Sequence, residues 1–188
     1  HQDLTRLSTE NRILVRETFY DYQGRAVIQT LPAPTLGSVL QYQQDFNLSQ
    51  ATGKAYTHTD FDLDDGTCLN IANPMSTLPN GAGVGGASNY YSPDNPDKSG
   101  YNASIPDAFG FPFTHVEYMP DNTGRIRRQG GPGLHHKLNS GHETMYWYGK
   151  PTQRELDRLF GSEAGYDSHY QKNMVRDANG QVSVSYLD

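Results

Sequence analysis

Apolar and polar positions alternate along the first strand-rich part of the chain, residues 12–34. In "RILVRETFY", Ile13, Val15 and Phe19 fall on one face of an extended segment, and the residues between them fall on the other. A period of two is typical of a β-strand with one buried face. The β-prone run "AVIQT" follows after "DYQGR". The pattern therefore predicts a hairpin with its turn between Asp21 and Gly24.

The same signals return twice further along the chain. Residues 105–150 contain "FPFTHVEYMPDNTGRIRRQ" and "GHETMYWYG", and residues 170–188 close with valines and a tyrosine that alternate with serines. Both stretches are predicted to be strand-rich. The stretch 35–104 is rich in Pro, Gly, Asn, Asp and Ser, most of all from about residue 70 to 104. A long irregular loop is predicted there, and its tyrosines and prolines favour a loop that lies along a larger surface.

One short helix is predicted near 152–160, in "KPTQRELDRLFG". Thr152 and Glu155 have the spacing of a capping box, and Gly161 is placed to end the helix. Leu156, Leu159 and Phe160 share one helical face. The elements together predict a mainly β protein that contains one short helix.

Composition limits the classes of function that this fold could serve. The 188 residues include 19 Gly, 11 Pro and 13 Tyr, and their formal net charge is -6. An acidic balance argues against a nucleic-acid partner. A single cysteine, Cys68, excludes an internal disulfide framework, and no apolar run reaches the roughly 18 residues of a membrane helix. We expect neither a nucleic-acid partner nor a membrane span.

An internal repeat is the most informative feature of the sequence. Asp-x-x-Gly occurs at Asp21/Gly24, Asp97/Gly100, Asp107/Gly110, Asp121/Gly124 and Asp177/Gly180. The Asp and Gly content makes about 1.5 such pairs the chance expectation, although turns favour both residues. Three of the pairs stand between two apolar runs, in "FYDYQGRAVIQT", "EYMPDNTGRIRRQ" and "MVRDANGQVSVSY". These three are predicted to close hairpins.

The fullest unit, "YDYQGR", joins Tyr20, Asp21, Gly24 and Arg25. It resembles the tyrosine-aspartate (YD) repeat of bacterial Rhs proteins, whose motif is Tyr-Asp-x-x-Gly-Arg followed by a strand. The likeness extends through "IPDAFGFPFTHVEYMPDNTGRI", with Asp107, Gly110, Asp121, Gly124 and Arg125, and through the closing segment with Asp177 and Gly180. It covers most of the chain and is weakest from 35 to 104.

The resemblance implies a fold and a role. Rhs proteins are β-hairpin ribbons that spiral into a hollow shell around a toxic C-terminal domain. Residues 1–188 would then be a segment of an antiparallel hairpin wall in a secreted or cell-surface bacterial protein. The segment would be structural, with no enzymatic activity, cofactor or metal, and its partners would be the rest of the same polypeptide and the toxin cargo. The turn residues would keep each hairpin in register.

The sequence departs from the repeat in several places. Gln181 stands where Arg is expected, Pro106 precedes Asp107 where Tyr is expected, and the loop and helix interrupt the period. No match to the family's autoproteolytic element is present, so no cleavage residues are assigned. The closing Tyr186-Leu187-Asp188 has the form of a further repeat's Tyr and Asp. We expect the sequence to stop inside a hairpin, which leaves the final strand as an unpaired edge unless something covers it.

Catalytic and metal-binding interpretations have weaker support. The histidines His135, His136 and His142, with Glu143, lack the i, i+4 spacing of a helical zinc site and lie in turn-rich text. Neither Ser140 nor Cys68 has the neighbours of a nucleophile. The acidic run Asp60–Asp65 has calcium-type ligands but no glutamate at the twelfth position of an EF-hand. Solvated loops are the predicted state of both regions.

One alternative function remains open from sequence. The chain could be an independent β-rich extracellular module that binds carbohydrate or another surface through exposed aromatics. The candidate residues are Tyr90, Tyr91, Trp147 and Tyr148. Further repeat units on both sides of residues 1–188 would exclude the module. A signal peptide directly before and a stop directly after would exclude the shell.

Overall fold

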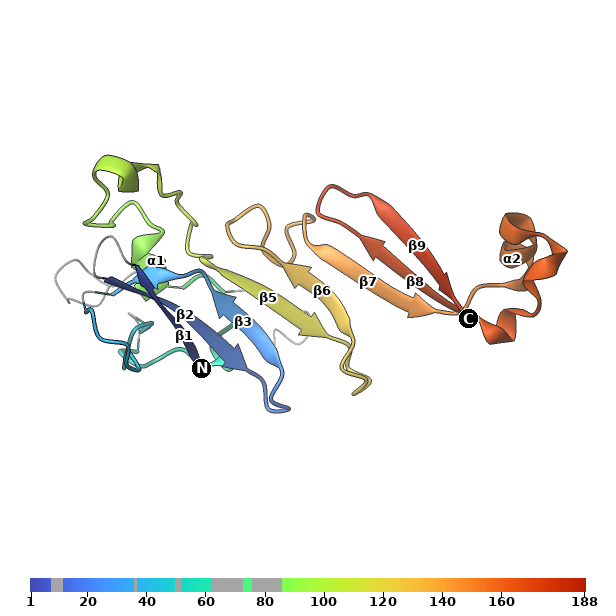
Figure 1. Cartoon of the computed structure of the whole chain (residues 1–188), viewed down its shortest axis with the longest axis horizontal. Coiled ribbons are helices and arrows are strands. Elements are labelled where there is room, and N and C mark those ends of the chain that lie inside the picture. Colours follow the sequence, from blue (N-terminus) through green and yellow to red (C-terminus); the bar gives the residue numbers. More distant parts are fainter. Residues whose placement is uncertain (8–11, 36, 50–51, 62–72, 76–85) are drawn as a thin grey trace.

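The computed structural model describes residues 1–7, 12–35, 37–49, 52–61, 73–75 and 86–188. The prediction of a mainly β protein is confirmed, because the strands form one nine-stranded antiparallel sheet in the order β1-β2-β3-β5-β6-β7-β8-β9, with β4 beside β2. The sheet runs along the length of an elongated molecule (Figure 1). Apart from β4, strands that follow one another in sequence are neighbours in the sheet, as in a meander.

The elements have the following bounds. The strands are β1 (Gln2–Leu7), β2 (Arg12–Tyr20), β3 (Ala26–Thr30), β4 (Ala33–Pro34), β5 (Phe113–Tyr118), β6 (Ile126–Gly130), β7 (Thr144–Gly149), β8 (Gln171–Arg176) and β9 (Val182–Leu187). The α-helices are α1 (Gly86–Tyr90) and α2 (Gln153–Phe160). Single 3-10 turns are η1 (His58–Phe61), η2 (Gly100–Ser104), η3 (Ser162–Ala164) and η4 (Asp167–His169).

Two elements were not predicted from sequence. Strand β1 pairs along the first part of β2, and helix α1 interrupts the stretch that was expected to be loop, so the prediction of a single helix was wrong. The predicted helix is present as α2, and the Thr152 hydroxyl caps it by accepting from the Glu155 backbone N–H at 3.3 Å. Its expected apolar face is only partly buried. Leu156 is inaccessible, whereas Leu159 and Phe160 are more than half exposed.

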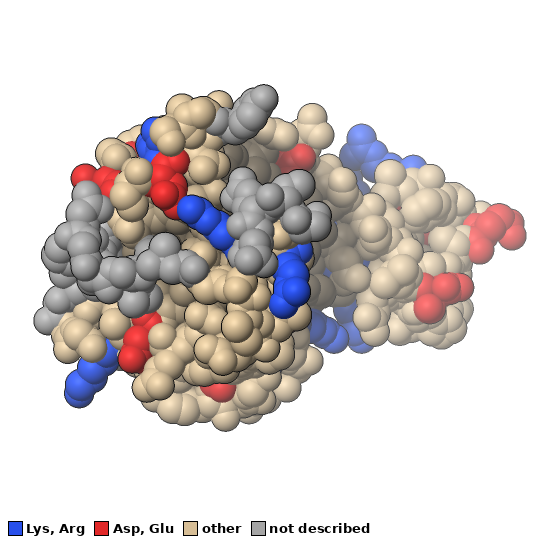
Figure 2. Space-filling model, turned by 60° about the vertical axis from the view of Figure 1, so that its left-hand side comes forward, with Lys and Arg blue, Asp and Glu red and all other residues tan. Residues whose placement is uncertain are grey.

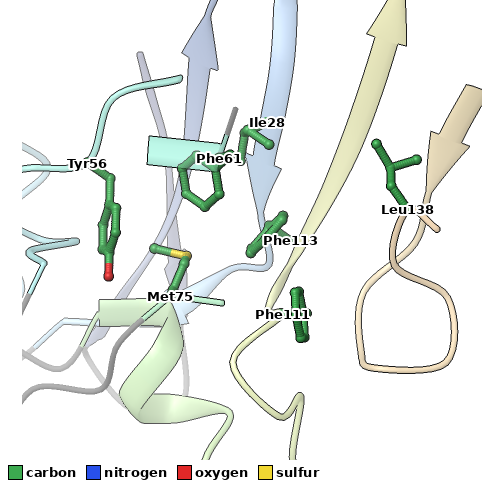
Figure 3. Packing of buried hydrophobic residues seen from close by; sticks show 7 residues of the cluster. All are labelled: Ile28, Tyr56, Phe61, Met75, Phe111, Phe113 and Leu138. Atoms are coloured by element: carbon green, nitrogen blue, oxygen red, sulfur yellow. The ribbon is translucent and has the colours of Figure 1, made fainter. Parts of the chain in front are cut away.

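A hydrophobic cluster covers one face of β3 and β5. Ile28 and Phe113 come from these strands, and the long excursion between them supplies Phe61, whose ring meets Phe113 edge-on at 4.9 Å between centroids. Tyr56, Met75, Phe111 and Leu138 complete the cluster (Figure 3). The described residues of the excursion therefore form a second layer on the N-terminal half of the sheet.

A second cluster fills the space beneath β2. Ile13 and Val15 are fully buried there with Ala33, Phe46 and Ala87. Helix α1 reaches this cluster because the Asn47 side chain accepts from the Ala87 backbone N–H at 2.9 Å. The irregular stretch is thus fixed to the sheet at its beginning and at α1.

The C-terminal strands differ from the rest of the sheet in burial. Every residue of β7, β8 and β9 is half-buried or exposed. One face carries an apolar row in which Trp147 pairs with Met174 and Met174 pairs with Val184. Trp147 is 43% exposed and Val184 is 42% exposed. This part of the sheet therefore stands as a single layer within the described chain.

A buried ionic group lies where β5 meets β6. The Glu117 carboxylate accepts from Arg128 and, at 2.9 Å, from Arg127. Arg128 also donates to the side-chain oxygen of Asn139. His115 lies on the same strand as Glu117 and is 6% exposed. Both members of the Glu117–Arg128 pair are almost fully buried, so each depends on the other for compensation of its charge.

No helix among the described residues is long and apolar enough to cross a membrane. On the face shown in Figure 2, lysine and arginine side chains are interspersed with aspartate and glutamate. That mixed surface gives no large field of one sign to steer a polyanion.

Candidate functional site

The turn between β2 and β3 is built by Asp21. Its Oδ1 atom accepts from the backbone N–H groups of Gln23 and Arg25, both at 2.9 Å. The Gly24 N–H donates to the Asp21 carbonyl at 3.0 Å, and Gly24 has a φ of 75°. A side chain at Gly24 would be strained by that backbone conformation. Aspartate and glycine at this spacing are therefore required by the turn itself.

The turn between β8 and β9 repeats this geometry. Asp177 Oδ1 accepts from the backbone N–H groups of Asn179 at 2.9 Å and Gln181 at 2.8 Å. The Gly180 N–H donates to the Asp177 carbonyl at 3.0 Å. This turn lies at the opposite end of the sheet from the Asp21 turn (Figure 1).

The turn between β5 and β6 is a longer version. The closing backbone bond joins the Met119 N–H to the Arg125 carbonyl, and Asp121 Oδ1 accepts from the Thr123 N–H at 3.1 Å and the Thr123 hydroxyl at 2.7 Å. Gly124 again has a positive φ, of 72°. The turn also touches its neighbour, because the Gln23 side chain donates to Asn122 at 2.9 Å.

The other two Asp-x-x-Gly pairs do not close hairpins. Asp97 binds the Arg12 guanidinium at 2.8 Å in the excursion. Asp107 accepts from the Phe109 N–H at 2.7 Å in a turn that leads into β5, with Gly110 at a φ of 82°. The short motif therefore specifies a turn, and flanking β-prone runs are needed to make it a hairpin.

Arg25 connects the first turn to the next strand pair. Its Nε donates to Asp21 Oδ2 at 2.7 Å, and its guanidinium carbon lies 4.4 Å from the ring centroid of Tyr118 at the end of β5. Burial tends to raise the pKa of Asp21, but hydrogen bonds from Arg25 and Gln23 outweigh it and lower that pKa. Asp21 thus stays ionised and holds the guanidinium over the tyrosine.

The tyrosine hydroxyl completes the junction between the strands. Tyr118 donates through its hydroxyl to the carbonyl of Ala26, the residue after Arg25, at 3.1 Å. The ring of Tyr118 therefore contacts the Arg25 guanidinium, and its hydroxyl bonds the carbonyl of the following residue of the neighbouring strand.

The same junction occurs between β6 and β7. The Arg125 guanidinium carbon lies 5.2 Å from the ring centroid of Tyr148, and the Tyr148 hydroxyl donates to the carbonyl of Ile126 at 3.0 Å. Burial, followed by the neighbouring Tyr146, raises the pKa of Tyr148, so its hydroxyl remains a donor.

A third junction joins β8 to β9 with altered chemistry. Lys172 pairs with Tyr186 across the strands, and its Nζ lies 5.9 Å from the ring centroid. The Tyr186 hydroxyl donates to the Glu155 carboxylate of α2 at 2.5 Å, and Lys172 donates to the same carboxylate at 2.5 Å. The hydrogen bond from Lys172, followed by that from Tyr186, lowers the pKa of Glu155.

We call these three contacts the tyrosine–cation ladder, with rungs Arg25–Tyr118, Arg125–Tyr148 and Lys172–Tyr186. All three tyrosines stand at or next to the last residue of a strand, at the same end of the sheet (Figure 1). Sequence reasoning singled out Arg25 and Arg125 only as turn residues and Tyr148 as an exposed aromatic. The sequence signal that was missed has two parts. A basic residue stands at the start of one strand, and a tyrosine stands at the end of the strand that pairs with it next in the sheet.

The histidines and the acidic run give no comparable arrangement. His135, His136 and His142 are exposed, and His142 Nδ1 lies 3.0 Å from the Ala178 carbonyl in the Asp177 turn. Glu143 is buried and accepts from the Gly141 N–H at 2.8 Å. Within the described ranges no group of three or more His, Cys, Asp or Glu could hold a metal ion. Cys68 and Asp62–Asp65 lie outside those ranges.

The proposed aromatic binding residues are divided between two places. Tyr90 and Tyr91 meet edge-on at 5.0 Å, and the Tyr91 hydroxyl donates to the Pro32 carbonyl at 2.8 Å. Both line a pocket of about 240 Å³ beside β2 and β4. Trp147 and Tyr148 lie on β7, beyond β3, β5 and β6 in the sheet order. The four aromatics therefore do not form one platform.

A comparison with known families finds no family model that matches this chain, and a search of curated proteins finds no match either.

Proposed function

We propose that residues 1–188 form a wall segment of a YD-repeat (Rhs-type) β-shell that encloses the C-terminal toxin domain of a secreted bacterial protein. The tyrosine–cation ladder is the observation that carries this proposal. Three junctions each place a basic side chain near a tyrosine ring at the same end of one sheet, twice with arginine and once with lysine. A repeated junction of this kind supports extension of a sheet by any number of strand pairs.

The shape of the sheet supports the same role. Among the described residues, β1 and β9 stand at the two ends of the strand order, so each has one edge with no described strand beside it. Open edges and a single-layered C-terminal part are costly in an independent domain, because unpaired backbone and exposed apolar rows invite association. Both features suit a segment whose neighbours continue the wall.

The role requires no catalytic residue of this segment. Its turns fix hairpin register, its ladder joins strand pairs, and the described parts of the excursion between β3 and β5 thicken one part of the wall. The cargo would be shielded mechanically, by closure of the sheet around it.

Limited proteolysis of the parent polypeptide tests the proposal. We expect its C-terminal domain to resist protease in the native protein and to become cleavable when Tyr118 and Tyr148 are both replaced by alanine. Tyr42→Ala is the matched control, because Tyr42 is 67% exposed and makes no ladder contact. A C-terminal domain that is cleaved equally fast in the native parent and in the double variant would contradict the shell role.

The binding-module alternative is favoured by the pocket at Tyr90 and Tyr91. Arg12 and Asn102 add polar groups to its apolar wall, which is the mixture that sugar sites use. A titration with oligosaccharides, compared between the native chain and Tyr91→Ala, tests this function. Binding that is lost in Tyr91→Ala would support the module, and the absence of binding in both would exclude it for the sugars used.

A further inference from the structure

Tyr20 at the end of β2 has the position of a ladder tyrosine without a partner. Tyr20 is 42% exposed, whereas Tyr118, Tyr148 and Tyr186 are each half-buried. Across the described residues, no cation lies on the Tyr20 ring and its hydroxyl makes no hydrogen bond. Tyr20 also begins the unit that resembles the YD repeat most closely.

The strand register shows where a cation must stand to reach such a tyrosine. Arg25 lies three residues before Ile28, Ile28 pairs with His115, and His115 lies three residues before Tyr118. The same spacing holds in the second rung, where Arg125 lies three residues before Arg128, Arg128 pairs with Met145, and Met145 lies three residues before Tyr148. It also holds in the third rung, through the pair Val175↔Ser183. All three rungs therefore obey one rule of position.

The rule gives a definite place when it is applied to Tyr20. Glu17 lies three residues before Tyr20 and pairs with Gln2 of β1. Three residues before Gln2 is the second position ahead of His1. The pairing already extends to His1, whose backbone bonds Thr18 through its nitrogen at 3.1 Å and its carbonyl at 2.8 Å. At roughly 3.3 Å per residue, a continued strand passes directly beside Tyr20.

We propose that Tyr20 is a docking site for an arginine or lysine at that second position, carried by a strand of the parent polypeptide that continues β1. The carbonyl of the residue directly before His1 then accepts from the Tyr20 hydroxyl, as the Ala26 carbonyl does from Tyr118. This inference rests on the proposed function, because it takes the neighbouring strand from the same wall.

Hydrogen exchange on an extended chain tests the site. In one chain Arg-Ser precedes His1, which puts arginine at the proposed position. In the matched control Ser-Arg precedes His1, so the charge is equal and the arginine is displaced by one residue. We expect the β1 amides to exchange roughly two- to fivefold more slowly with Arg-Ser than with Ser-Arg, the effect of one partly exposed cation–ring contact. The difference should vanish in Tyr20→Leu.

Equal exchange in the two extended chains would overturn the docking site, and so would a difference that survives in Tyr20→Leu. Slower exchange that appears only with dimer formation would assign Tyr20 to a second copy and would also overturn it.

The parent sequence separates this inference from the proposed function. Repeat units on both sides with a residue other than Arg or Lys two positions before His1 would remove the docking site and leave the shell. Protection that depends on Tyr20, in a parent without flanking repeats, would leave the site and remove the shell.

Discussion

The Arg25–Tyr118 rung predicts a measurable coupling between two side chains that are distant in sequence. Tyr118→Phe removes the hydroxyl that donates to the Ala26 carbonyl at 3.1 Å and keeps the ring beneath Arg25. Water can replace the lost donor because Ala26 is exposed. The expected cost is therefore at the low end for a hydrogen bond, about 0.5–1 kcal/mol.

Arg25→Met removes two interactions at once. The first is the ion pair between Arg25 and Asp21, whose side chains are 26% and 14% exposed. The second is the contact of the guanidinium with the Tyr118 ring. The ion pair contributes about 0.3–1 kcal/mol and the cation–ring contact about 0.5–1 kcal/mol. We expect Arg25→Met to lower the free energy of unfolding by about 1–2 kcal/mol.

A double-mutant cycle isolates the contact between the two residues. Urea denaturation followed by circular dichroism is measured for Arg25→Met, Tyr118→Leu, the double variant and the native chain. The coupling free energy should be about 0.5–1 kcal/mol. Arg158→Met replaces Arg25→Met in the control cycle, because Arg158 is exposed on α2, and that cycle should be additive. A coupling for Arg25 and Tyr118 no larger than the control would refute the ladder as a stabilising junction.

Three further predictions concern the interior beside the ladder. Burial, followed by the charge of Arg128, lowers the pKa of His115 from 6.5 to about 4, so stability should fall as the pH drops from about 6.5 to 4, and denaturation curves of His115→Gln should lack that dependence. Arg128→Met leaves the Glu117 carboxylate buried without its main partner and should cost about 3 kcal/mol in urea denaturation, whereas a loss under about 1 kcal/mol would show that the pair is not needed. Gly130→Ala places a methyl group 2.7 Å from a backbone nitrogen of the following loop, whereas the methyl group of Gly24→Ala meets open space and strains only the backbone φ. Gly130→Ala should therefore lower the melting temperature more than Gly24→Ala, and the reverse order would contradict the packing at β6.

The turns could be predicted from sequence because their chemistry is local. Asp21 bonds backbone groups two and four residues ahead, and Gly24 supplies the positive φ, so all the information lies within five positions. Strand β3 and helix α2 were predictable for the same reason, from alternation and from a cap at Thr152.

Elements that depend on distant partners were not predictable. Helix α1 has the sequence "GASNY", which has little helical propensity, and it is held by Asn47 through a bond across 40 residues. The ladder has the same property, because Tyr118 and its acceptor Ala26 are 92 residues apart. Only the sheet order places a strand that ends in tyrosine beside a strand that starts with arginine.

The last rung explains how the single-layered part of the sheet keeps its end in place. Where Tyr118 and Tyr148 bond a backbone carbonyl, Tyr186 bonds the Glu155 carboxylate, which also accepts from Lys172. The two contacts with Glu155 tie the start of β8 and the end of β9 to α2. The next residue of α2, Leu156, is fully buried.

The charge states of the rung agree with that role. Hydrogen bonding to Glu155 raises the pKa values of both Lys172 and Tyr186, and the same bonds lower that of Glu155. At neutral pH the carboxylate is therefore charged, the ammonium is charged and the phenol is a donor, which are the states that all three contacts require. Because the pKa of Glu155 is lowered, its contacts with Lys172 and Tyr186 contribute fully to stability at any pH above the ordinary pKa of a glutamate. That contribution is lost as the pH falls through the lowered pKa of Glu155. The Glu155 carboxylate of α2 thus takes the place that the carbonyl of the residue after the arginine occupies in the other two rungs.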